Sequence, residues 1–184
     1  MTEPNKEYDY IRVQGCDVFF YCEVSEESVA ELCTAVKKLE MVQLGLGVER
    51  PAVTVHIMSN GGELYSGISC MDYFASLERT YITTIAEGVC ASAATFIFLG
   101  GDRRIVAPNA YILIHQIGIG FWGKFEELKD EMKQCQQLMD HVKGIYMERT
   151  LLTEKKLRKL FKHDIYLPYK KCIKYGLEQY LMTA

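Results

Sequence analysis

The sequence lacks the features that mark several large classes of protein. Its 184 residues contain no apolar run of about 18 residues, the length that a membrane-spanning helix needs. The polar opening MTEPNKEYDY has no basic region followed by an apolar one, so no signal peptide is predicted. The net charge is −3 and lysines alternate with glutamates instead of forming a basic stripe. We therefore expect neither a membrane nor a nucleic acid as a partner.

Cysteines are present, but not in the patterns that bind metals. Seven are scattered along the chain, no two form a C-x-x-C motif, and none clusters with the four histidines at zinc-binding spacing. An odd number of cysteines without a signal peptide favours reduced thiols and a cytoplasmic location. We therefore expect no metal and no cofactor, and interpret most of these cysteines as small buried apolar side chains.

Apolar patterning predicts strands that alternate with helices. Ser25 is predicted to cap a first helix, and a second helix is expected around 68–75. This alternation predicts an α/β fold with a mostly parallel sheet and right-handed crossovers. The apolar fraction of 49% fits one domain with a sizeable core. Four segments have the composition of strands: 17–21, 52–58, 81–88 and 111–116.

The segment from Lys124 to Arg149 has a different pattern, a narrow apolar seam at heptad spacing over about three heptads. Such a helix could pack on its own domain or dock on another subunit, and the narrow seam favours the second interpretation. Beyond it, Thr153 is predicted to cap a short helix, and a final helix is expected to end at Gly176. The seam comprises Phe125, Leu128, Met132, Cys135, Met139, Val142 and Tyr146.

Among the seven serines, Ser92 has the position best suited to chemistry. It follows a strand, a glycine and a short bend, and it precedes AATFIFLGG, which has a helical composition. The free N–H groups of a new helix favour developing negative charge, and the small neighbours Ala91, Ala93 and Ala94 leave room for a substrate. A tightly packed serine cap is the commoner outcome for such a position taken alone. A weaker variant makes Cys90 the nucleophile.

His115 is the best placed of the four histidines to act as a base. It ends the apolar run YILIH at the expected carboxyl edge of the sheet, where ligands collect in open α/β folds. A half-buried structural histidine is the alternative. Spacing alone does not choose the carboxylate that would orient the imidazole, because Asp164, Asp102 and Asp130 are all eligible.

The paired glycines of SNGGE, residues 59–63, directly follow a central strand. Paired glycines permit positive φ angles and allow a backbone N–H to approach a ligand closely. The N–H groups of Gly62 and Ala93 could form an oxyanion hole for a tetrahedral intermediate. An ordinary tight turn is the simpler interpretation of a lone Gly-Gly pair.

Together these segments resemble the ClpP family, the proteolytic subunits of Clp proteases, which are self-compartmentalised serine peptidases. SNGGELYSG is similar to the family's S-P-G-G-x-x-x-x-G, and GVCASAATFIFLGG is similar to G-x-A-A-S-M-G/A. RRIVAPNAYILIHQ is similar to R-x-x-x-P-N-[SA]-x-x-M-I-H-Q, and HDIYLPYKKCIKYGLEQ to D-x-[FY]-[LM]-x(7)-[EK]-Y-G-L. The motifs occur in the family's order, and the resemblance runs from about Asp17 to Leu181.

The resemblance implies a crotonase-like ClpP fold of repeated ββα units in a single domain, residues 1–184. A head is expected at about 17–116, a handle strand and long handle helix at 117–150, and a return to the head at 151–181. The handle strand would pair with an extended peptide by backbone hydrogen bonds.

The resemblance also assigns roles to residues of the site. It makes Ser92 the nucleophile, His115 the general base and Asp164 the orienting acid. The oxyanion and substrate-binding residues are then Gly61, Gly62 and Ala93. The implied reaction is hydrolysis of peptide bonds in polypeptides through an acyl-enzyme.

The implied assembly is a homo-oligomer of two stacked seven-membered rings, a tetradecamer, with a Clp-type ATPase as a possible partner. This sequence departs from the family pattern at Asn60, Ala93 and Ile117, and His163 stands where many members have an arginine that helps to lock the rings. The strand VTVHIM lacks the aromatics on which the ATPase docks, so docking is the least supported implication. One alternative is a catalytically silent ring subunit of a mixed complex, and another is an enzyme that acts on acyl-thioesters. The complete set of three catalytic residues argues against both.

Overall fold

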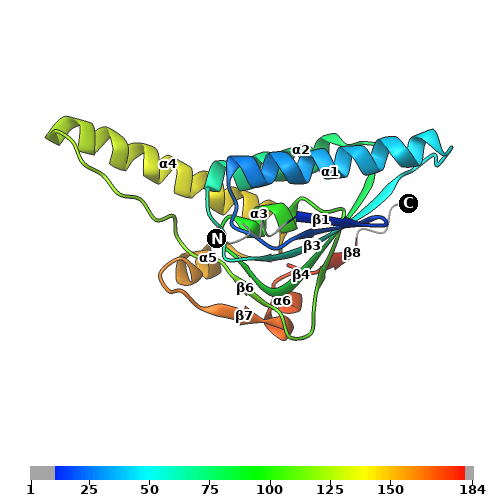
Figure 1. Ribbon diagram of the computed structural model, residues 1–184. Helices are drawn as coiled ribbons and strands as arrows, with labels where there is room; N and C mark the ends of the chain where they lie inside the picture. Colours follow the sequence, from blue (N-terminus) through cyan, green and yellow to red (C-terminus); the bar gives the residue numbers. More distant parts are fainter. Residues whose placement is uncertain (1–10, 181–184) are drawn as a thin grey trace, which may run out of the picture.

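Strands and helices alternate along the chain, as the apolar pattern predicts. The structure, a computed structural model, describes residues 11–180 (Figure 1). The predicted polar segment 1–10 and the end of the predicted return segment at 181 lie outside the described residues. In chain order the elements are β1 (Ile11–Gln14), β2 (Asp17–Phe20), α1 (Glu26–Gly45), β3 (Ala52–Ser59), α2 (Leu64–Ser76), β4 (Tyr81–Ala91), α3 (Ala94–Leu99), β5 (Arg103–Val106), β6 (Tyr111–Leu113), α4 (Phe125–Arg149), α5 (Glu154–Leu160), β7 (Tyr166–Pro168), α6 (Tyr169–Lys174) and β8 (Gln179–Tyr180).

The sheet is mostly parallel, which confirms the predicted α/β class. Its main path runs β1-β2-β3-β4-β5-β8, and β6 joins through β4 and also pairs with β7. The pairs β2–β3, β3–β4, β4–β5 and β4–β6 are parallel. The antiparallel pairs β1–β2, β5–β8 and β6–β7 all lie at the margins of the sheet.

The long strand β4 changes partner along its length, and this change positions the site. Residues 83–86 pair with β5, whereas residues 89–91 pair with β6. Gly88 lies between the two halves with a φ of +52°, a conformation that glycine adopts readily. The register with β3 also shifts between Ile57 and Ser59. The bend therefore directs the end of β4 away from β5 and alongside the end of β6.

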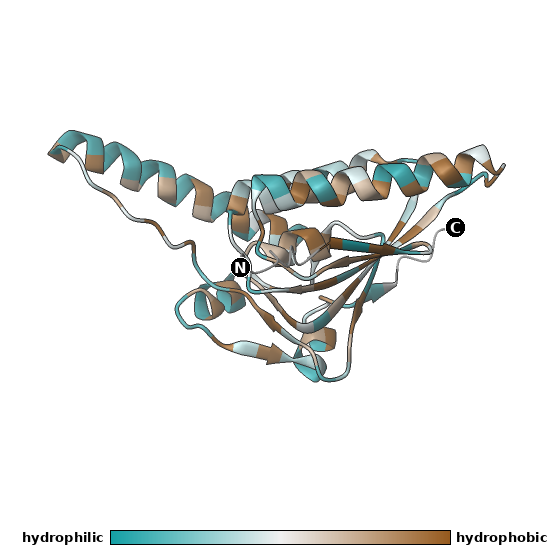
Figure 2. Ribbon diagram, in the orientation of Figure 1, coloured by the Kyte–Doolittle hydropathy of each residue, from teal (hydrophilic) through white to brown (hydrophobic). Residues whose placement is uncertain are grey.

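Helices α1 and α2 lie together over one face of the sheet (Figure 1). The predicted cap of α1 is confirmed: the Ser25 hydroxyl accepts from the Ser28 N–H at 3.1 Å, and the Ser28 hydroxyl accepts from the Ser25 N–H at 2.9 Å. The core fills the space between these helices and the sheet, and α3 is wholly buried within it. Figure 2 shows α3 and much of the central sheet in the colour of apolar residues. Burial of this apolar surface is the main force that holds the site's framework together.

The predicted apolar seam of α4 divides into two parts. Val142 and Tyr146, near the helix's C-terminal end, are buried in the core of the same chain. Phe125 and Met132, near its N-terminal end, are 71% and 64% exposed. This exposed half extends away from the body of the molecule (Figure 1). The interpretation of packing within one domain therefore holds for the C-terminal half, and the N-terminal half has an apolar surface that residues 11–180 leave exposed.

The predicted helix ends near the C-terminus are also found. The Thr153 hydroxyl caps α5 by accepting from the Lys156 N–H. Helix α6 ends at Lys174, and Gly176 follows with a φ of +67°, two residues from the predicted end. The part of the chain that the structure describes has no helix long and apolar enough to cross a membrane.

One strand prediction needs correction, and another finds no partner in this chain. The strand predicted at 111–116 ends at Leu113, because Leu113 is the last residue of β6 that has a partner on either side. The predicted handle strand has no pairing partner in the structure, since residues 114–124 form no strand, and it stays a prediction for the chain with a bound peptide. A strand needs a neighbour for its backbone N–H and C=O groups, and none of the residues 11–180 provides one there. Short strands β1, β5, β7 and β8 were outside the prediction.

Candidate active site

Ser92 lies on the sharp turn that joins β4 to α3. Its φ is +53°, the only positive value at a non-glycine position within 11–180. A left-handed conformation costs a non-glycine residue about 1–2 kcal/mol, so neighbouring groups must hold it. The Ser92 N–H donates to the Leu113 carbonyl at 2.9 Å, and the Ser92 carbonyl accepts from the Thr95 N–H at 3.0 Å. The turn is thus tied to β6 on one side and to α3 on the other.

Gly61 brings the loop after β3 into direct contact with this turn. A Cβ added at Gly61 would lie 2.6 Å from the Ser92 Cβ, and its φ of +99° also favours glycine. The Gly61 N–H donates to the Ser59 hydroxyl at 3.1 Å, and its carbonyl accepts from the Val24 N–H at 2.8 Å. Because its own N–H is occupied, Gly61 offers no free donor to the site. Its role is to let the loop after β3 approach the Ser92 turn closely.

Gly62 and Ala93 do present free donors. The Glu63 N–H donates to the Val24 carbonyl at 2.8 Å, and this bond anchors Gly62 beside the start of α1. Neither the Gly62 N–H nor the Ala93 N–H has an acceptor among residues 11–180. Ala93 is the N-cap of α3, where a helix leaves its first N–H groups unpaired. The two groups predicted for the oxyanion hole are therefore unoccupied on either side of Ser92.

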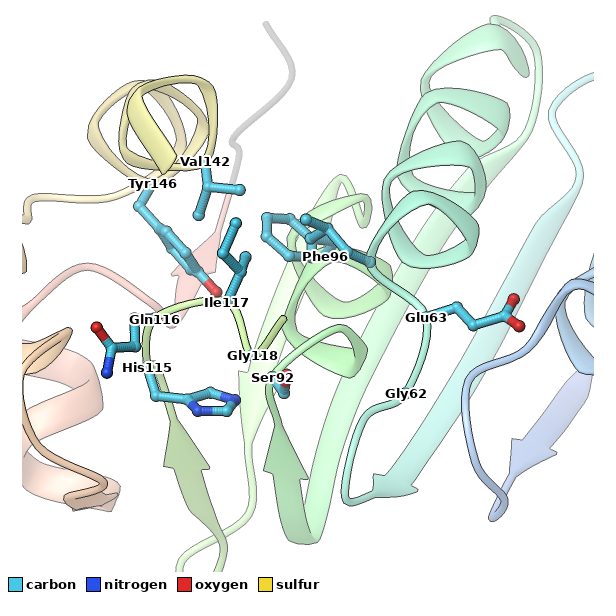
Figure 3. Close-up of a pocket in the computed structure, with 11 residues that line it drawn as sticks. Gly62, Glu63, Ser92, Phe96, His115, Gln116, Ile117, Gly118, Val142 and Tyr146 are labelled. Atoms are coloured by element: carbon cyan, nitrogen blue, oxygen red, sulfur yellow. The ribbon is translucent and has the colours of Figure 1, made fainter. Parts of the chain in front are cut away.

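His115 lies two residues beyond the end of β6, on the chain that passes Ser92. Its ring points toward Ser92 in Figure 3. Its Nδ1 lies 3.4 Å from Oδ1 of Asp164, which comes from the loop between α5 and β7. The His115 side chain is 27% exposed and the Asp164 side chain 74%. The separation is longer than the 2.7–3.2 Å of a usual hydrogen bond, and such contacts often shorten only when substrate binds.

Ser92 and His115 line the same pocket, which has a volume of about 240 Å³ (Figure 3). One wall is apolar and is formed by Phe96, Ile117, Val142 and Tyr146. A second hollow of about 280 Å³ shares Leu64, Ile117 and Gly118 with the first, so the two form one groove. An extended chain placed in this groove would pass the Ser92 hydroxyl.

The other residues considered from the sequence lie elsewhere. Asp102 accepts a hydrogen bond from the Ile82 N–H at 2.8 Å, and Asp130 is exposed on α4. Cys90 is fully buried, and burial raises the pKa of its thiol far above the usual range. A buried neutral thiol is a poor nucleophile, which argues against the Cys90 variant. No group of three or more potential metal ligands is found within the part of the chain that the structure describes.

Two residues near the site were missed by sequence reasoning. Tyr146 lines the pocket, Thr95 is buried next to it, and their hydroxyl oxygens are 2.5 Å apart. In the sequence, Thr95 is one residue of a segment with helical composition and Tyr146 is one member of the apolar α4 seam, so neither pattern marks a site residue. The spacing of Thr95 was the one available signal. A threonine hydroxyl can donate to the backbone carbonyl three residues earlier, which for Thr95 is that of Ser92.

Comparisons of the sequence with known proteins give one consistent family. The sequence model of the Clp protease family matches residues 7–184. The chain is similar to an ATP-dependent Clp protease proteolytic subunit of Chlorella vulgaris, with 29% identity over 170 residues that cover 91% of this chain and 82% of that protein. It is also similar to proteins of the same name from Deinococcus radiodurans, at 30% identity over 68% of this chain and 62% of the relative, and from Mesostigma viride, at 27% over 95% and 75%.

Proposed function

Since the chain belongs to the Clp protease family, we propose that it is a serine endopeptidase subunit that hydrolyses peptide bonds of polypeptides. The observation that carries this proposal is the shared pocket of Ser92 and His115, with Ser92 on a strained turn. Asp164 faces Nδ1 of the imidazole, where it can fix the tautomer. No metal or cofactor enters the proposed reaction.

The proposed reaction is acyl transfer in two halves. His115 removes the proton of the Ser92 hydroxyl as the oxygen attacks the peptide carbonyl, and then donates that proton to the leaving amine. A water molecule enters, His115 removes its proton as the water oxygen attacks the acyl carbon, and His115 then returns that proton to the Ser92 oxygen as the acyl group leaves. Asp164 stabilises the imidazolium that forms in each half of the reaction.

The free N–H groups of Gly62 and Ala93 are proposed to stabilise the tetrahedral intermediate. Both are backbone donors held by well-packed segments, so little reorganisation is needed when the oxygen becomes negatively charged. Ala93 stands where the family often has methionine, and the change leaves the backbone donor in place.

We propose that an extended peptide lies along residues 118–121. These residues make no backbone hydrogen bond within 11–180, so their N–H and C=O groups can pair with a substrate backbone. Such pairing is insensitive to most side chains, and the apolar wall of the pocket would select the residue next to the scissile bond.

The proposed assembly is a ring-shaped homo-oligomer, in which two stacked seven-membered rings meet through the exposed half of α4. The support for this is the apolar surface that Phe125 and Met132 present on that half. The division into a head, 17–116, a handle, 117–150, and a return, 151–181, belongs to the same proposal, as do a cytoplasmic location and a Clp-type ATPase partner.

Covalent labelling tests the proposed activity. The purified protein is incubated with a fluorophosphonate probe, the labelled residue is identified by mass spectrometry, and hydrolysis of a short fluorogenic peptide is followed in parallel. We expect label on Ser92 and peptide hydrolysis, and neither in the Ser92→Ala variant. Cys90→Ala should retain both. An assembled, folded wild-type protein that stays unlabelled would falsify the proposal.

A further inference from the structure

A chain of hydrogen bonds leads from α4 to the backbone of Ser92. The Thr95 hydroxyl donates to the Ser92 carbonyl at 2.6 Å, in addition to the Thr95 N–H, which bonds to the same oxygen at 3.0 Å. On its other side, the Thr95 oxygen lies 2.5 Å from the Tyr146 hydroxyl. Ser92, Thr95 and Tyr146 are thus linked in series, although Tyr146 is 54 residues from Ser92 in the sequence.

The direction of each bond follows from the number of hydrogens. A hydroxyl has one hydrogen, and that of Thr95 is used on the Ser92 carbonyl. The Tyr146 hydroxyl must therefore be the donor in its contact with Thr95. Such donation polarises the Thr95 hydroxyl and strengthens its bond to Ser92.

The surroundings keep this arrangement fixed. The side chains of Thr95 and Tyr146 are buried, and the Tyr146 ring lies 5.4 Å from that of Phe96 and 6.2 Å from that of Phe161. Burial raises the pKa of Tyr146 well above its ordinary value, so the hydroxyl keeps its proton at neutral pH. Tyr146 is therefore able to donate at neutral pH.

The Ser92 carbonyl is the point at which this chain can control the nucleophile. With a φ of +53°, Ser92 has a strained backbone that persists only where its neighbours determine it. Its N–H is held by Leu113, and among residues 11–180 its carbonyl is held by Thr95 alone, through two bonds. Relaxation of the strained φ would rotate Ser92 about its N–Cα bond and turn its side chain away from its present direction.

We propose that Thr95 and Tyr146 are positioning residues for Ser92, which hold its strained backbone in the orientation that presents its hydroxyl to His115. This inference rests on the proposed function, because positioning has a kinetic effect only if Ser92 is the nucleophile. Neither residue is proposed to touch the substrate's reacting atoms.

Four variants test the inference. Thr95→Val removes the hydroxyl with little change of shape, Thr95→Ser keeps it, and Tyr146→Phe removes only the outer donor. The matched control is Thr84→Val, since the buried Thr84 hydroxyl also donates to a carbonyl of α3, that of Phe98, at 2.7 Å. The measurements are the second-order rate of fluorophosphonate labelling, kcat and KM for a fluorogenic peptide, and the melting temperature.

Loss of one such bond is expected to lower the labelling rate and kcat by about threefold to tenfold, with KM nearly unchanged. We expect this for Tyr146→Phe and a larger loss for Thr95→Val, while Thr95→Ser restores most of the rate. Thr84→Val should lower the melting temperature and leave the labelling rate of the folded protein unchanged.

The outcomes separate the two proposals. If the wild-type protein is labelled and Tyr146→Phe and Thr95→Val are labelled equally fast, the positioning inference is overturned and the proposed function stands. If Thr95→Val fails to fold, Tyr146→Phe and Thr95→Ser still decide the matter. An unlabelled wild-type protein overturns the proposed function and this inference with it.

Discussion

Gly61 and Ser92 lie so close together that only glycine fits at position 61. A Cβ added there would be 2.6 Å from the Ser92 Cβ and 2.7 Å from the Ala91 carbonyl oxygen, and both distances imply overlap of atoms. The loop after β3 and the turn after β4 are therefore one packed unit, which sets the distance between the Gly62 donor and the nucleophile.

Replacing Gly61 with alanine is expected to displace the Ser92 turn. The free energy of unfolding should fall by about 2–4 kcal/mol from overlap and backbone strain together, and the fluorophosphonate labelling rate should fall at least tenfold. Gly47→Ala is the matched control, because Gly47 has a φ of +81° but open space around it. That variant should lose only about 1 kcal/mol, measured by urea unfolding, and label normally. Equal labelling of the two variants would contradict the packed unit.

Two helical glycines should respond to alanine with opposite signs. A Cβ on Gly67 of α2 would lie 2.5 Å from the Ala93 carbonyl oxygen, whereas a Cβ on Gly144 of α4 meets nothing within 4 Å. Alanine is the better helix former by about 0.8–1.0 kcal/mol, so Gly144→Ala should stabilise the protein by about that amount. Gly67→Ala should destabilise it and slow labelling of Ser92. Urea unfolding curves of both variants provide the check, and stabilisation by Gly67→Ala would show that α2 can move away without cost.

The stability of the fold should fall in acid partly through Glu40. The Lys37 ammonium, with the Thr80 hydroxyl at 2.9 Å, lowers the pKa of this buried carboxyl, although burial itself acts in the opposite direction. A carboxyl with a lowered pKa in the folded state contributes stability above its unfolded pKa of about 4.3, and the contribution is lost as the pH falls. Glu40→Gln should therefore be less stable than wild type at pH 7, with the difference shrinking toward pH 3. Urea unfolding between pH 3 and 7 measures this, and exposed Glu49→Gln is the control. A constant difference across that range would exclude the ion pair as its cause.

Much of the fold followed from local patterns, because long apolar strands and capped helices leave regular signals. The caps at Ser25 and Thr153 were predicted because a hydroxyl at a helix start has a local role. Strands β1, β5, β7 and β8 were missed because they have two to four residues each, too few for a period to show. Their existence depends on pairing with distant segments, which no local pattern records.

The site was only partly visible in the sequence. Ser92 could be singled out because small residues and a strand-to-helix junction surround it, and His115 because it follows a strand. Asp164 lies in a loop without periodicity, so only the family resemblance chose it. The hydrogen bond between Thr95 and Tyr146 was beyond sequence reasoning, because it depends on how the C-terminal part of α4 packs against α3.

The exposed half of α4 provides the last prediction, on assembly. Phe125 and Met132 lie on one seam of this helix, and apolar side chains this exposed are typical of surfaces that bury against a partner. If this half of α4 joins subunits, the double variant Phe125→Asp/Met132→Asp should reduce the mass in solution, because unpaired carboxylates resist burial in an apolar contact. Light scattering measures the mass, and Gln137→Asp, an exposed change on the same helix outside the seam, should leave it unaltered. A wild-type protein that remains a monomer at all concentrations tested would refute the assembly, whereas unchanged mass in the double variant would place the contact between subunits on another surface.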